Sequence, residues 1–219
     1  MSTEAEHTSR DDYAAERPKA FIDAVVAIAM TLLILPLMES VSEISASNGT
    51  AMEWAFEHSD LIVSFVLSFV IIAMFWLNHH RLFNVVDRLT NAALWLLVAW
   101  MLTIVWLPVA TAISGHLSAK DASAKVIYVG SMILTALLSF AVRTYLARHG
   151  ELHRATPEQL RSGMAVDLTL ALLFGIALLV AVMFPCIGYL SMLVMFANPL
   201  VQRAFERVLP LPHSRPRRG

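Results

Sequence analysis

The sequence predicts an all-α integral membrane protein with six membrane-spanning helices. Of its 219 residues, 58% are hydrophobic and 15% are charged, whereas soluble domains are closer to half apolar and a quarter charged. Several apolar runs also reach the roughly 20 residues that a helix needs to cross a bilayer core. We do not expect the first run to be a cleaved signal peptide, because Asp23 interrupts it and no small-residue cleavage site follows Leu35.

Each predicted helix is an apolar run bounded by polar or turn-forming residues. Pro18 fits the first turn of the first helix, where its missing N–H would have no partner. Pro108 lies inside the third helix and should bend it. Pro185 and Gly188 predict a tight turn between the last two helices. The six helices are expected at residues 18–38, 61–78, 92–113, 126–146, 164–184 and 187–201.

These helices are expected to form one six-helix transmembrane domain, residues 17–205, between a flexible polar tail, 1–16, and a basic tail, 206–219. Six spans put both termini on one side of the membrane. Of the 16 Lys and Arg residues, all but Lys120 and Lys125 fall on that side. Because Lys and Arg are retained on the cytoplasmic face, both termini are expected to be cytoplasmic.

Two aspartates lie within spanning runs, Asp23 and Asp167. An ionised carboxylate is costly there, so it is usually paired or faces water. Asp167 is expected to be a charge at a helix end. Asp23 is either a helix-end charge near Lys19, four residues earlier, or part of a polar network with the second helix. The donors at matching depth are Trp76, Asn78, His79 and His80, in FWLNHHRLF.

Two motifs resemble the transmembrane protein 175 family of potassium channels. Arg17, Phe21 and Asp23 in RPKAFID fit the R-x-x-x-F-S-D signature that opens helix one in that family, and AVVAIAMTLL is similar to its continuation. WLNHHRLF resembles the family's W-x-N-H-H signature in helix two. The resemblance covers essentially the whole spanning region. Ile22 stands where the family has serine, which removes one hydroxyl from the expected network.

The resemblance implies a homotetramer in a bacterial inner membrane, with helix one of each subunit lining a central, potassium-permeable pore. It also implies that Arg17, Phe21, Asp23, Trp76, Asn78, His79 and His80 brace helix one against helix two. Ala24, Ile28, Thr31 and Leu35 recur at helical spacing and form one stripe. By the resemblance, Ile28 forms the constriction and Thr31 a hydroxyl ring. The alternative is that the stripe is ordinary packed core.

The segment 39–60 favours cations over anions. It carries acidic residues and no Lys or Arg, and repeated around a tetramer it would raise the local cation concentration. A merely solvated acidic loop is the alternative. We find no TVGYG filter loop, so selectivity is expected to be weak. The acidic residues are Glu39, Glu43, Glu53, Glu57 and Asp60.

The rival function is a proton-coupled secondary transporter that uses Asp23 and His79 as titrating groups. A metal site is disfavoured because the adjacent His79 and His80 project about 100° apart on a helix. No catalytic or phosphate-binding motif points to an enzyme. The expected partners are other copies of the chain, membrane lipid and potassium ions, with no cofactor and no nucleic acid.

Overall fold

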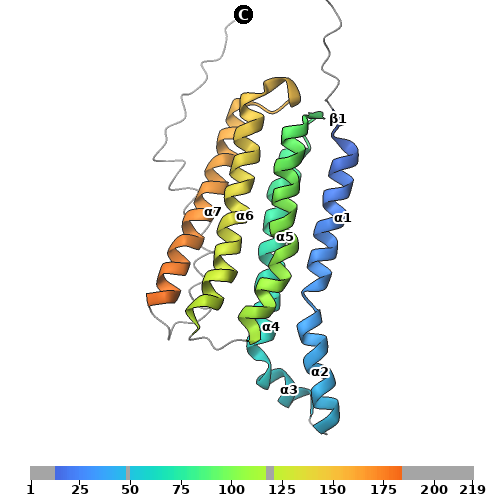
Figure 1. The fold of residues 1–219 in the computed structure, drawn as a ribbon, viewed down its shortest axis with the longest axis vertical. Coiled ribbons are helices and arrows are strands. Elements are labelled where there is room, and N and C mark those ends of the chain that lie inside the picture. The colour runs from blue at the N-terminus through green and yellow to red at the C-terminus, as the bar shows by residue number, and fades with distance from the viewer. Residues whose placement is uncertain (1–12, 48–49, 117–120, 184–219) are drawn as a thin grey trace, which may run out of the picture.

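The computed structural model describes residues 13–47, 50–116 and 121–183, and this part is a bundle of long helices (Figure 1). Five of its helical segments are long and apolar enough to cross a membrane. The helices are α1 (Glu16–Leu32), α2 (Leu35–Ser47), α3 (Ala51–Glu57), α4 (Ser59–Phe83), α5 (Asn91–His116), α6 (Ala122–Arg148), the short 3-10 helix η1 (Gly150–Leu152) and α7 (Pro157–Met183).

The first five predicted spans are confirmed as helices, and the sixth, 187–201, lies outside the described residues. The largest difference in a helix start is at α7, which begins at Pro157 rather than at 164. Thr156 and Gln159 explain the early start, since each side chain bonds the other's backbone N–H, at 3.2 and 3.0 Å. This reciprocal cap, with proline at the first helical position, is a standard helix start.

The first span is interrupted, whereas the sequence predicted one unbroken helix over 18–38. Leu33 and Ile34 form a turn between α1 and α2, and the N–H of Ile34 bonds the carbonyl of Thr31 at 3.3 Å. The cause is Pro36, which has no N–H to donate to the carbonyl of Leu32 and whose ring crowds that carbonyl. Pro108, in contrast, lies inside α5, which continues to His116.

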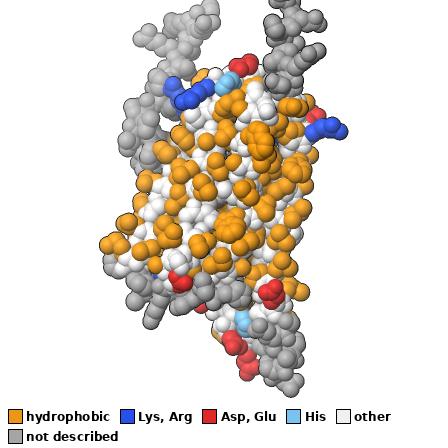
Figure 2. All heavy atoms as spheres, viewed as in Figure 1, with side chains coloured by type: hydrophobic (Ala, Val, Ile, Leu, Met, Phe, Trp, Pro, Cys, Tyr) orange, Lys and Arg blue, Asp and Glu red, His pale blue; other side chains and the backbone are white. Residues whose placement is uncertain are grey.

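Neighbouring helices pack in sequence order, α4 on α5, α5 on α6 and α6 on α7, and α1 packs on α5 and α4. The buried interior is dominated by large side chains, including Trp100, Tyr128, Phe75 and Phe174. Apolar side chains also cover most of the visible outer surface (Figure 2). Such a surface suits a lipid environment, because side chains that face the hydrocarbon core of a bilayer are predominantly apolar.

The two ends of the bundle differ. At one end, α2 and α3 extend beyond the other helices (Figure 1); we call it the α3 end. At the other, the strand end, β1 (Tyr13–Ala14) pairs antiparallel with β2 (Arg88–Leu89), and the N–H of Ala15 bonds the carbonyl of Asp87 at 3.1 Å. Residues 13–16 were predicted to belong to the flexible tail, but these contacts fix them. The rest of that tail and the tail 206–219 lie outside the described residues.

Lys125 is not a free charge at the α3 end. Its side chain is 9% exposed, and its ammonium donates to the carbonyl of Ala181 near the end of α7 at 2.8 Å. In a continued helix that carbonyl would accept from residue 185, which is proline and has no N–H. The lysine therefore satisfies a backbone carbonyl and places a positive charge at the negative end of the helix dipole.

We expect Lys125→Met to destabilise the protein by about 1–2 kcal/mol, because a charge-assisted hydrogen bond is lost while the side-chain volume is kept. Thermal unfolding of the purified protein in detergent measures this. Lys120→Met, which removes the other lysine of the same connection, is the control. Equal melting temperatures for the Lys125 variant and the wild type would contradict this role.

Candidate functional site

One face of α1 is buried against the bundle and the opposite face is open. Ile22, Val26, Ala29 and Leu33 are almost fully buried. The stripe Ala24, Ile28, Thr31 and Leu35 is exposed in the single chain, with Ile28 59% and Leu35 51% exposed. The stripe is therefore not packed core within the subunit, which was the alternative reading. It needs lipid, water or another subunit against it.

The hydroxyl of Thr31 is oriented by its own helix. It donates to the carbonyl of Ile28 at 2.7 Å, one turn earlier. With its hydrogen used in this way, the oxygen keeps its lone pairs for other partners. An exposed oxygen with free lone pairs can accept from water or coordinate a cation.

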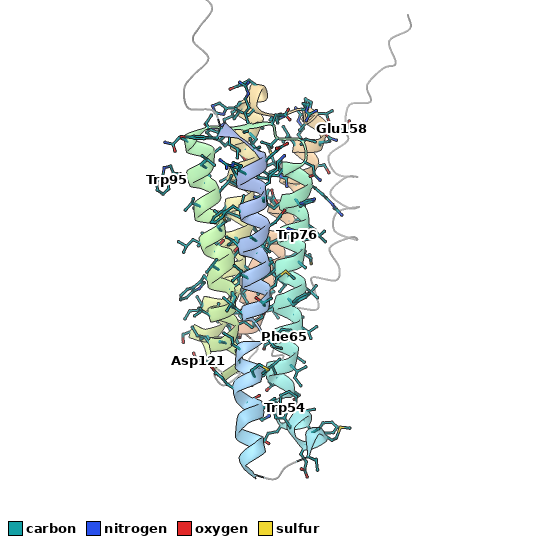
Figure 3. The ribbon with its side chains drawn as sticks, turned by 90° about the vertical axis from the view of Figure 1, so that its right-hand side faces the viewer. Trp54, Phe65, Trp76, Trp95, Asp121 and Glu158 are labelled. Carbon is teal, nitrogen blue, oxygen red and sulfur yellow. The ribbon has the colours of Figure 1, made fainter. Side chains whose placement is uncertain are left out.

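Asp23 connects α1 to α4. The indole N–H of Trp76 donates to its carboxylate at 2.8 Å, and Nδ1 of His80 lies 4.0 Å from the same oxygen. The Trp76 and His80 rings pack together with centroids 5.4 Å apart. Lys19, the other candidate partner, instead donates to the carbonyl of Val86 at 2.9 Å. Trp76 lies on α4 beside α1 (Figure 3).

Asn78 belongs to a different cluster, formed with Arg143 of α6 and Asp167 of α7. Asn78 donates to Asp167 at 2.5 Å and accepts from Arg143 at 3.0 Å. Arg143 Nε lies 2.8 Å from the other carboxylate oxygen of Asp167. Asp167 is 1% and Arg143 5% exposed. The prediction that Asp167 is a helix-end charge is wrong, because it is the buried anion that holds three helices together.

His79 contacts neither aspartate. Its ring stacks between Phe83 and Trp100, with centroid distances of 4.3 and 4.2 Å, and its Nε2 has no hydrogen-bond partner among the described residues. A cavity of about 30 Å³ lies between His79 and Asp23. That is room for a water molecule.

Arg17 and Phe21 lie apart from the Asp23–Trp76 contact. Phe21 is 61% exposed. Both side chains line an open groove of about 700 Å³ between the start of α1 and α5, with Leu94 and Met101 on its far wall. The seven residues expected to form one bracing network are thus divided among four local environments.

The acidic segment at the α3 end contains a well-capped helix. The backbone N–H of Thr50 donates to the carboxylate of Glu53 at 2.8 Å, and this bond holds the pKa of Glu53 below its usual range. The indole of Trp54 donates to Ser40 at 3.2 Å, which ties α3 to α2. No group of three or more potential metal ligands occurs in the part of the chain that is described.

The Asp23–Trp76 bond is expected to be worth about 1 kcal/mol, as is usual for polar contacts between membrane helices. A double-mutant cycle with Asp23→Ala and Trp76→Phe, followed by thermal unfolding, measures it. We expect the double variant to lose less stability than the sum of the losses measured for the two single variants. Trp95→Phe is the control, since Trp95 is 68% exposed and points away from the bundle (Figure 3). Strict additivity would mean that the bond contributes nothing.

Comparison with known proteins gives a consistent family. Residues 17–108 match the family model described as endosomal/lysosomal potassium channel TMEM175. This region includes α1 and α4 with both motifs. Relatives named as potassium channels occur in bacteria. One from Streptomyces collinus is 30% identical over 62% of this chain and 66% of its own length, and one from Chamaesiphon minutus is 28% identical over 56% and 61%.

The chain therefore spans less than two thirds of the length of these curated relatives. The fold extends further than the sequence matches. A crystal structure titled as a lysosomal potassium-selective channel TMEM175 homolog from Chamaesiphon minutus superposes with a TM-score of 0.66 at 22% identity, over 87% of this chain and 97% of that chain. Residues 17–108 of this multi-pass membrane protein match the TMEM175 family, a family of ion channels and not of enzymes.

Proposed function

We propose that the protein is a potassium-permeable, weakly selective cation channel of a bacterial inner membrane, built as a homotetramer with α1 of each subunit around a central pore. The observation that carries this proposal is the open stripe of α1. The helix is anchored by one face, and its other face presents Ile28, Thr31 and Leu35, which the described part of the subunit leaves uncovered. Four such faces around an axis would form stacked rings.

The rings account for a passive and modestly selective pore. A ring of Ile28 side chains makes an apolar constriction, which can gate by losing its water. One turn away, a ring of Thr31 oxygens could replace part of the hydration shell of a monovalent ion. Side-chain rings lack the stacked backbone carbonyls of highly selective filters, so potassium would be preferred only weakly over sodium.

Charge at the α3 end supports permeation by cations. Glu53 and Asp121 are carboxylates that are ionised at neutral pH. The bonds from Thr50 lower the pKa of Glu53 further, and those from the hydroxyl and the N–H of Ser123 lower the pKa of Asp121. Lys125, a cation at that end, is committed to the carbonyl of Ala181. With the strand end cytoplasmic, as the Lys and Arg distribution predicts, the outer approach to the pore would be negative.

The transporter alternative needs Asp23 and His79 to exchange a proton. Asp23 instead accepts from Trp76, and His79 is enclosed by two aromatic rings. No observation favours that function, and the family is one of channels.

Recording from purified protein in planar bilayers tests the proposal. We expect unitary currents that reverse at a potential showing a modest preference for potassium over sodium. Chemical cross-linking in detergent should stop at four subunits. Saturating, substrate-dependent flux without unitary events would overturn channel function, and a different subunit number would overturn the assembly.

A further inference from the structure

A second cavity, of about 560 Å³, opens at the strand end of the bundle between α4, α6 and α7. Its polar wall includes Asn78, Arg81, Arg143 and Glu158. The cavity lies on the opposite side of α4 from the Asp23 contact, and no step of the proposed permeation pathway uses it. Arg143 is a buried cation of this wall, and ionisable groups inside a membrane bundle are costly and often mark functional sites.

Arg143 is only partly satisfied by its neighbours. Its Nε bonds Asp167 and its Nη2 bonds Asn78, but a guanidinium carries five N–H donors. Nη1 bonds no described residue, although the side chain is 5% exposed. Nη1 is not among the buried atoms that lack a partner, so it is open to the cavity that Arg143 lines, where an acceptor from outside the protein could bond it.

Gly163 gives the guanidinium its place in the wall. A Cβ at this position would collide with Nη1 of Arg143, so a larger residue would displace the side chain. Gly163 also lines the cavity. The absence of a side chain at Gly163 therefore leaves room for the guanidinium beside α7, in the wall of the cavity.

Two further features make the cavity suitable for an anion. Arg81 lines it from α4, and no described carboxylate forms an ion pair with Arg81. The start of α7 also lines it, through Thr156 and Gln159. The N–H groups of these two residues are already bonded within the cap, so the helix end contributes only its partial positive charge. Arg143 and Asp167 compensate each other, and Glu158 opposes Arg81 with one negative charge, so an anion would be held by directed hydrogen bonds rather than by an excess of positive charge.

We propose that this cavity binds a phosphate group, with the headgroup phosphate of an anionic phospholipid of the cytoplasmic leaflet as its source. Arginine forks suit phosphate oxygens, and basic pockets between helices on the cytoplasmic side are a known way to bind acidic headgroups. The apolar side chains of Leu82 and Val166 in the same wall would contact the lipid beyond the headgroup. The choice of leaflet rests on the orientation given under the proposed function.

Native mass spectrometry and thermal unfolding of the full chain in detergent test this site. The probes are phosphatidylglycerol, phosphatidylcholine and inorganic phosphate, each added alone. We expect phosphatidylglycerol to bind and to raise the melting temperature, and phosphatidylcholine to do neither. Arg81→Gln should weaken phosphatidylglycerol binding about tenfold or more, the scale of one lost charged hydrogen bond.

Glu158→Gln should strengthen binding, because it removes the opposing carboxylate from the wall. Arg161→Gln is the matched control, since Arg161 lies on the same helix end but does not line the cavity, and it should leave binding unchanged. Inorganic phosphate that reproduces the shift, with the same response to Arg81→Gln, would support the phosphate site with a soluble anion as its source.

Equal binding of phosphatidylglycerol and phosphatidylcholine would overturn the proposal, and so would affinities that ignore Arg81→Gln and Glu158→Gln. None of these measurements depends on ion conduction. A protein that binds the phospholipid but carries no current would contradict the proposed channel function and support the phosphate site. A protein that conducts but does not bind the phospholipid would support the channel function and contradict the phosphate site.

Discussion

Asp167→Ala is expected to lower the free energy of unfolding by about 3–5 kcal/mol, the usual cost of removing one partner from a buried ion pair. The carboxylate is 1% exposed and accepts from both Arg143 and Asn78. Without it, the guanidinium remains buried with its charge uncompensated. Thermal unfolding in detergent and the yield of monodisperse protein measure the loss.

Two controls separate this effect from a general sensitivity of α7. Glu158→Ala removes an exposed carboxylate from the same helix and should change stability by no more than about 0.5 kcal/mol. Arg143→Met combined with Asp167→Leu removes both charges and keeps apolar volume, and it should recover much of the lost stability. A double variant as unstable as Asp167→Ala would show that charge compensation is not the reason for the loss.

The contacts of Asn78 and Trp76 connect α6 and α7 to α1 through α4. Asn78 fixes one side of α4 to α6 and α7, and Trp76, two residues earlier, fixes another side of α4 to α1. On its α4 side, the helix that carries the stripe thus contacts a helix that is itself held in place by α6 and α7. We infer that the Arg143–Asp167 pair supports the position of α1 without touching it.

Helical periodicity explains why the expected bracing network divides. Residues four apart share a helix face, so Trp76 and His80 can both reach Asp23. Asn78 and His79 point in other directions from the same turns, toward α7 and α5. Matching residues by depth alone selected all four donors, whereas depth together with rotation about the helix axis would have selected two.

The buried ion pair shows a second limit of the sequence reasoning. Arg143 was counted among the cytoplasmic charges because it lies near the end of a spanning run, and Asp167 was assigned to a helix end. Once α7 is known to begin at Pro157, Asp167 lies almost three turns inside it and opposite Arg143 in the α6–α7 hairpin. The helix start at Thr156, Pro157 and Gln159 was the signal that would have placed the aspartate in the interior.

The helices themselves were readable because twenty-residue apolar runs have few alternatives in a membrane. The break at Leu33 and Ile34 was also encoded, by Pro36, but the continuous apolar run concealed it. Packing against α4 and α5 decides which face of α1 is buried. Because that choice depends on tertiary structure, the sequence alone could not decide whether the stripe lines a pore or is packed core.

Ile28→Asn is expected to increase the unitary conductance severalfold and to move the potassium-to-sodium permeability ratio toward one. The physical reason is that, in the proposed pore, a ring of amide side chains would keep water in the constriction, whereas a ring of isoleucines would exclude it. Ile28 is 59% exposed on the open face of α1, so the substitution leaves the buried face intact and should change the melting temperature little. Single-channel recording under potassium and sodium gradients measures both quantities.

The matched control is Leu179→Asn on α7, an exposed leucine, 63% accessible, on a helix that does not pack against α1 (Figure 1). It makes the same kind of change on the same kind of surface, but outside the proposed pore, and should leave both conductance and reversal potential as in the wild type. If Ile28→Asn behaves like this control while channels still open, Ile28 does not form the narrowest ring. Conductance that responds instead to Thr31→Val or Leu35→Asn would move the constriction along the same stripe.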